Sequence, residues 1–182
     1  DGGIVWGVGD LAEVYFSTEK LEIGDVVSFD TDTQNAVKKS SQAYEDKIVG
    51  VVSGYPFALA MAMNESMLER DDHYPIALVG KMMVKVSLEN GPIKVGDPLT
   101  ASSTPGYAMK ALKSSKIIGF AFDSFNGALQ STKGVEQMFD DISSCYDCEQ
   151  SYRIYENTQE QIPGYYKKGM MLALVRAINH YE

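Results

Sequence analysis

The chain has 182 residues, of which 45% are hydrophobic and 23% charged, a composition typical of one folded globular domain and unlike that of a disordered chain. Its formal net charge of -9 argues against a nucleic-acid partner and against binding to an anionic membrane surface. It contains no run of about 18 apolar residues, so we expect no membrane insertion.

Short segments rich in Val, Ile, Phe and Met predict strands, because they are separated by Gly, Asp, Asn, Pro and Ser. In chain order they are 26–29, 48–53, 76–88, 117–122 and 170–178. In the longest, Met82, Val84 and Val86 alternate with polar residues that include Lys81 and Lys85, which predicts a strand with one buried face. Helix signals are weak and restricted to 58–70 and 134–143.

An internal repeat gives the clearest indication of the fold. Three blocks recur in the same order: Leu21-Glu22-Ile23-Gly24-Asp25 with Ile93-Lys94-Val95-Gly96-Asp97, Ala36-Val37-Lys38 with Ala108-Met109-Lys110, and Lys47-Ile48-Val49-Gly50 with Lys116-Ile117-Ile118-Gly119. The first two blocks keep the same spacing in both copies, and the following loop differs by three residues. The structural turn residues are Gly24, Asp25, Gly96 and Asp97, because glycine permits positive φ and aspartate bonds nearby backbone amides.

The repeat predicts a mainly β domain over residues 1–182, a barrel or clip of two pseudo-symmetric strand-turn-strand units. Unit one spans about 21–54 and unit two about 93–124. A polar insertion then covers about 126–168, and 169–178 forms a closing strand.

Metal and cofactor sites are not indicated. Cys145 and Cys148 form a C-x-x-C pair, but only His73 and His180 could complete a zinc site, and no βαβ setting supports a redox site. Nucleotide-binding glycine motifs and a hydrolase nucleophile elbow are absent from the sequence. We therefore expect no metal, no cofactor and no metabolic activity.

Several blocks carry a family resemblance. They are Asp10-Leu11-Ala12-Glu13, Gly24-Asp25-Val26-Val27 and residues 48–53 in the first half, and residues 75–80, 84–86, 89–97 and 99–110 in the second. Together they resemble the intramolecular-chaperone autocleavage peptidase domain of phage appendage proteins and the similar domains of bacterial surface proteins. The resemblance covers about 10–125 and the last strand, but not 126–168. Leu11 stands where many members have Tyr.

The resemblance implies a homotrimeric module of a virion, cell-surface or extracellular fibre, with identical subunits and an upstream fibre segment as its partners. It also implies self-cleavage at the bond between Gly9 and Asp10, with Asp10 and Glu13 as the catalytic residues. Two carboxyl groups can serve as acid and base if they lie close together. Alternatively, Asp10 is a turn residue and Glu13 is a surface or subunit-contacting charge.

Three functions therefore remain open. The first is a structural and assembly module. The second is a single-turnover autoprotease, which would be the chain's only enzymatic activity. The third is a surface or glycan-binding adhesin that uses the tyrosine-rich segment 126–168.

Overall fold

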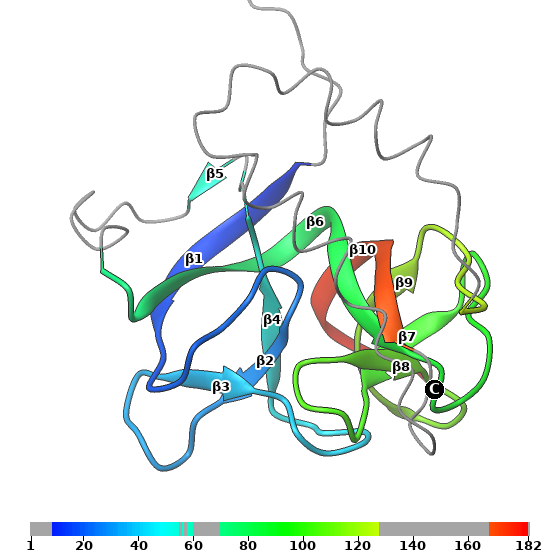
Figure 1. Cartoon of the computed structure of the whole chain (residues 1–182), viewed down its shortest axis with the longest axis horizontal. Helices are drawn as coiled ribbons and strands as arrows, with labels where there is room; N and C mark the ends of the chain where they lie inside the picture. The colour runs from blue at the N-terminus through cyan, green and yellow to red at the C-terminus, as the bar shows by residue number, and fades with distance from the viewer. Residues whose placement is uncertain (1–8, 55, 57, 60–69, 128–167, 182) are drawn as a thin grey trace, which may run out of the picture.

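A computed structural model describes residues 9–54, 56, 58–59, 70–127 and 168–181. Within these residues the regular elements are all strands (Figure 1). In chain order they are β1 (Asp10–Phe16), β2 (Val26–Phe29), β3 (Val37–Lys39), β4 (Ile48–Val52), β5 (Ala58–Leu59), β6 (His73–Ser87), β7 (Pro98–Ala101), β8 (Ala108–Lys110), β9 (Ser115–Ala121) and β10 (Lys168–Tyr181).

The long strand β6 belongs to both halves of the structure. Its first half pairs with β1 and β4, with Ala77 opposite Val51. Its second half pairs with β10 and β8, with Val86 opposite Ala108. Figure 1 shows β1 to β4 on one side of β6 and β7 to β10 on the other.

Each half forms its own ring of strands. Strands β6, β10, β9, β7 and β8 pair in a ring, which gives a five-stranded barrel. On the other side the strands pair in the order β1, β6, β4, β2 and β3. A bridge between Phe16 and Ala36 completes this ring. The prediction of a mainly β barrel with two pseudo-symmetric units is confirmed.

The two halves also repeat in detail. A Cβ atom on Gly50 would lie 2.2 Å from the carbonyl oxygen of Ala77, and one on Gly119 would lie 2.0 Å from that of Leu174. Gly24 and Gly96 have φ values of 85° and 86°. The strands therefore pass too close for any side chain at Gly50 and Gly119, whereas the positive φ angles of Gly24 and Gly96 form the matching turns.

The structure changes the alignment of the second repeat block by one residue. Lys39, and not Lys38, is the counterpart of Lys110: their Nζ atoms lie 3.5 Å and 3.8 Å from the carboxylates of Asp25 and Asp97, respectively. The loop from β2 to β3, residues 30–36, is one residue longer than the loop from β7 to β8, residues 102–107. Because Ala36-Val37-Lys38 matches Ala108-Met109-Lys110 in residue type, the sequence alignment did not show this extra loop residue.

Two clusters of buried side chains form the core. The larger fills the β6–β10 barrel and includes Met82, Val84 and Val86, as the alternating pattern predicts. It also extends to buried residues of β2 and β4: Val26, Ile48 and Val51. The smaller lies within unit one and includes Leu21, Val37 and Ile76. Burial of apolar area at about 25 cal/mol per Å² drives the formation of both clusters.

The prediction that the polar face of β6 is exposed to solvent is wrong for the second half of the strand. Lys81 is exposed, but Lys85 is 5% and Ser87 0% exposed. The turn of unit one covers this face, a tertiary contact that alternation along one strand cannot reveal. The expected helix at 58–70 is wrong at its start, where Ala58 and Leu59 form β5. The rest of that segment up to residue 69, the candidate helix 134–143 and nearly all of the insertion lie outside the described residues.

A buried ion-pair network joins unit one to β6. Lys85 Nζ lies 2.7 Å from Asp25 Oδ1 and 2.6 Å from Glu22 Oε2. The backbone N–H of Glu22 donates to Asp25 Oδ2 at 2.8 Å. Burial lowers the pKa of Lys85, but hydrogen bonds to the two carboxylates outweigh it, so the pKa is raised above its usual value. Lys85 therefore stays charged, and its partners compensate for its burial.

Unit two contributes to this network as well. A Cβ atom on Gly106 would lie 2.6 Å from Asp25 Oδ1, and the Gly106 carbonyl accepts a hydrogen bond from Val26 N at 2.8 Å. The ring of Tyr107 lies 5.8 Å from Lys85 Nζ. The ion pair consequently fixes the loop of unit two against the turn of unit one.

The two turn aspartates provide a matched stability test. Asp25→Ala leaves Lys85 buried beside the half-exposed Glu22 alone, so we expect a loss of about 3–5 kcal/mol in the free energy of unfolding. Asp97→Ala breaks a half-exposed pair with Lys110 and a turn hydrogen bond, so we expect a loss of about 1 kcal/mol. Urea denaturation compares them, and equal losses would contradict the role given to Lys85.

Candidate functional site

The candidate cleavage residue Asp10 opens β1 with its side chain inside the protein. Asp10 pairs with Gly80 of β6 and is 4% exposed. Ala12 is also buried, whereas Leu11 between them is 39% exposed. The side chains of β1 alternate here, and Asp10 lies on the inner face.

Gly80 makes room for Asp10. Its φ is 134°, and a Cβ atom there would lie 2.4 Å from the Gly9 carbonyl oxygen and 2.8 Å from Asp10 Cβ. Any other residue at position 80 would therefore displace the start of β1. The Gly9 carbonyl also accepts a hydrogen bond from the backbone N–H of Lys81 at 3.3 Å. The peptide bond between Gly9 and Asp10 is thus held against β6 by its own carbonyl group.

The Asp10 carboxyl group has only part of its hydrogen bonds within the described structure. Burial raises its pKa above the usual value of 3.8, and a hydrogen bond with the Ser53 side chain opposes this shift. Its Oδ2 atom has no hydrogen-bond partner among the described residues. Burial shifts the equilibrium of this acid toward its neutral form, and the neutral form can donate a proton.

Glu13 lies elsewhere. Its carboxylate accepts a hydrogen bond from the Tyr15 hydroxyl at 2.9 Å. Burial and, after it, the interaction with Glu13 together raise the pKa of Tyr15 to about 12. Glu13 and Tyr15 share one face of β1, and Asp10 lies on the other. The structure therefore does not bring Asp10 and Glu13 together within one chain, and their catalytic role stays a prediction.

The remaining sequence candidates are structural or fall outside the described residues. Gly24, Asp25, Gly96 and Asp97 form the two turns already described. Cys145 and Cys148 lie outside the described part of the chain. Within that part, no three His, Cys, Asp or Glu side chains form a group suited to a metal ion. In the same part, no helix has the length and apolar character to cross a membrane.

Sequence reasoning missed Ser53 and Gly80, which build the surroundings of Asp10. Both lie in blocks that carry the family resemblance, 48–53 and 75–80, but the sequence does not show that Ser53, after β4, and Gly80, in the middle of β6, lie beside Asp10. Only the pairing of β1 with β6 places Gly80 at the site. A glycine inside a long predicted strand was the one available signal.

The raised pKa of Asp10 predicts a pH-dependent stability. A buried acid with a raised pKa stabilises the fold below its unfolded pKa, and that contribution is lost as pH rises through the folded pKa. Asp10→Asn removes the ionisable group, so the variant should gain stability relative to the parent as pH increases. Urea denaturation across pH measures this gain, with the exposed Asp46→Asn as the control. Parallel pH profiles for the parent and Asp10→Asn would contradict the buried state of Asp10.

Comparison with known proteins assigns the chain to no family. No protein-family model and no curated protein matches the chain. Among solved structures, the pre-mature form of bacteriophage phi29 gene product 12 matches with 16% identity and a TM-score of 0.49, over 64% of this chain and 19% of that protein. A C-terminal fragment of the same gene product matches with 14% identity and a TM-score of 0.49, over 91% of this chain and 99% of the fragment. The chain spans about a fifth of the longer match, and at these values neither similarity carries an argument about fold or function.

Proposed function

We propose that this protein is a structural and assembly module of a virion or extracellular fibre, which associates with identical subunits, as a trimer, and follows an upstream fibre segment. The observation that carries the proposal is a row of exposed and half-buried apolar side chains across neighbouring strands, called here the outward row. Its residues are Leu11 of β1, Val79 of β6, Phe120 of β9, Leu174 of β10 and Phe122 just after β9.

Strand pairing places most of the outward row on one surface. Leu11 lies opposite Val79, and Leu174 lies opposite Phe120. Paired residues of adjacent strands point to the same side of a sheet, so these side chains share a face. Leu11, Val79 and Phe122 are 39%, 42% and 52% exposed. An apolar surface of this kind is typical of a protein contact.

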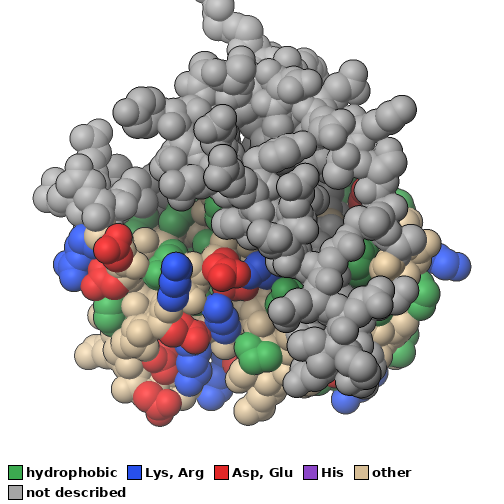
Figure 2. Space-filling model, in the orientation of Figure 1, with side chains coloured by type: hydrophobic (Ala, Val, Ile, Leu, Met, Phe, Trp, Pro, Cys, Tyr) green, Lys and Arg blue, Asp and Glu red, His purple; other side chains and the backbone are tan. Residues whose placement is uncertain are grey.

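Two cations lie among these apolar side chains. Lys81 Nζ lies 5.4 Å from the centre of the Phe122 ring, and Arg176 pairs opposite Val79. Aromatic and arginine side chains are enriched in protein interfaces. In a chain of net charge -9, a surface that carries cations is also suited to an acidic copy of itself. Figure 2 shows Lys and Arg beside Asp and Glu on one face of the molecule.

Val79→Asp tests the outward row. A carboxylate there would be buried between subunits, so we expect the dissociation constant of the oligomer to rise at least tenfold. Sedimentation equilibrium measures the constant, with Leu112→Asp as the matched control because Leu112 is 64% exposed and lies outside the row. If the two variants associate equally well, the outward row is not the contact.

A second candidate is single-turnover autoproteolysis, favoured by the environment of Asp10. The reaction adds water across the bond between the Gly9 carbonyl carbon and the Asp10 nitrogen. Asp10 combines burial, a raised pKa and an unpartnered Oδ2 atom next to that bond. The bond from Lys81 N to the Gly9 carbonyl would withdraw electron density from the carbonyl carbon.

The intact mass of a precursor with its natural upstream segment tests this candidate. The parent should yield two species divided between Gly9 and Asp10, and Asp10→Asn should remain one species. Glu13→Ala separates the alternatives: uncut protein would assign Glu13 a role in cleavage, acting from a neighbouring chain, and normal cleavage would remove Glu13 from the mechanism. One full-length species for the parent would exclude autoproteolysis and leave the assembly module unaffected.

A further inference from the structure

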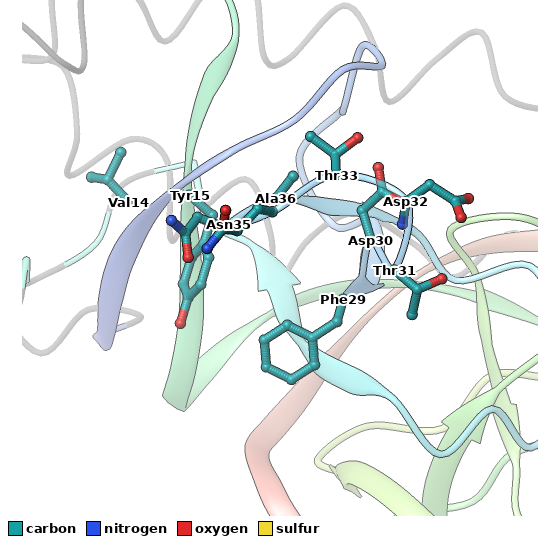
Figure 3. A pocket seen from close by; sticks show the side chains of 10 residues that line it. Val14, Tyr15, Phe29, Asp30, Thr31, Asp32, Thr33, Asn35 and Ala36 are labelled. Atoms are coloured by element: carbon teal, nitrogen blue, oxygen red, sulfur yellow. The ribbon is translucent and has the colours of Figure 1, made fainter.

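A pocket lies at the corner of unit one, away from Asp10 and from the outward row. It has a volume of 670 Å³, which is within the range of small-molecule sites. One wall is β1, at Val14 and Tyr15, and the other is Phe29 with the loop 30–36 (Figure 3). The bridge from Phe16 to Ala36 ties the loop to β1, so the two walls keep a fixed spacing.

The pocket combines aromatic rings with planar polar groups. Phe29 is 52% exposed, although it is part of a short strand. Figure 3 shows its ring and that of Tyr15 together with the side chains of the loop. The loop supplies two carboxylates, two amides and two hydroxyls: Asp30, Thr31, Asp32, Thr33, Gln34 and Asn35.

The loop is held in shape before any ligand arrives. Asp30 N donates to the Ala36 carbonyl at 2.9 Å, and Asp32 N donates to Asp30 Oδ1 at 3.1 Å. Lys38 Nζ reaches Asp30 at 3.2 Å and Asp32 at 3.6 Å. Asn35 has a φ of 58°, which is uncommon for a residue other than glycine. Such order lowers the entropic cost of binding.

Unit two shows that the fold does not require this pocket. The counterpart of Phe29 is Ala101, which is 0% exposed. The corresponding loop is one residue shorter and bonds to itself, with Ser102 Oγ donating to the Thr104 carbonyl at 3.2 Å. The same strand pairing thus forms with a small buried residue. The exposed ring and the longer polar loop are specific to unit one.

The ligand chemistry follows from these groups. A flat aromatic ring packs against the C–H face of a sugar, and carboxylates and amides bond its hydroxyls. Asp30 and Asp32 share the single cation Lys38, so the pocket disfavours a phosphate or an acidic sugar. The hydrogen bond from the Asp32 backbone N–H holds the pKa of Asp30 below its usual range, so this carboxylate accepts hydrogen bonds at neutral pH.

We propose that the pocket formed by Tyr15, Phe29 and the loop 30–36 binds one ring of a neutral saccharide. This site consists of other residues than the tyrosine-rich segment 126–168 and goes beyond the assembly role. It would give a fibre module a contact with a glycan-covered surface.

The test is an NMR titration of the ¹⁵N-labelled protein with four probes: the methyl α-glycosides of glucose, galactose and mannose, and N-acetylglucosamine. Concentrations up to about 50 mM cover the millimolar affinity expected for one ring. We expect saturable shifts at Tyr15 and residues 29–36 with at least one probe. Phe29→Ala should weaken binding at least fivefold, and Asp32→Ala should weaken it measurably. Leu112→Ala should leave binding unchanged, because Leu112 is 64% exposed but lies outside both the pocket and the outward row.

Two results would overturn the proposal. One is the absence of saturable shifts at the pocket with all four probes. The other is binding that survives Phe29→Ala in a protein whose spectrum shows an intact fold. A change of oligomeric state in Phe29→Ala, without an effect on sugar binding, would instead assign the pocket to a contact between copies. Association through Val79 is measured separately, so neither result bears on the assembly proposal.

Discussion

The buried ion pair between Lys85 and Asp25 is the interaction on which the relation between the two units depends. Asp25 and Lys85 are 1% and 5% exposed, and they come from the turn of unit one and from the strand that both units share. Gly106 of unit two lies directly against the same carboxylate. A charge buried in this way is tolerated only with its partner in place, so the pair permits one arrangement of the turn, β6 and the unit-two loop. In unit two the turn aspartate Asp97 pairs with Lys110, the counterpart of Lys39, so the repeated turn itself does not need a buried lysine partner.

Sharing of β6 explains why two similar units form one body. Each unit has four strands of its own and lacks a fifth, and the 15 residues of β6 supply the fifth strand to both. Neither ring can close without its own part of β6. Because the units share β6 and not their corner loops, the two corners can differ in sequence. Unit one has the exposed Phe29 and a long polar loop, whereas unit two has the buried Ala101 and a short loop.

Much of the fold followed from the sequence, because turn glycines and strand alternation are local signals. Gly24, Gly96 and the buried series from Met82 to Val86 lie as predicted. Contacts between distant segments could not be predicted in this way. The burial of Lys85, the extra residue before Lys39 and the position of Gly80 under Asp10 depend on strand pairing. For the same reason, the sequence spacing of Asp10 and Glu13 suggested a carboxylate pair, although alternation along β1 separates them.

The structure thus relates three features of different kinds: a buried acid at the entry to β1, an outward apolar row on the shared sheet, and a polar aromatic pocket at one corner. The proposed assembly role depends on the second feature, because an exposed apolar surface is suited to a contact with further copies of the chain. Native mass spectrometry of the whole chain, over a range of protein concentrations, tests this claim most directly. The account predicts a complex with the mass of three chains. A single chain at every concentration would contradict it.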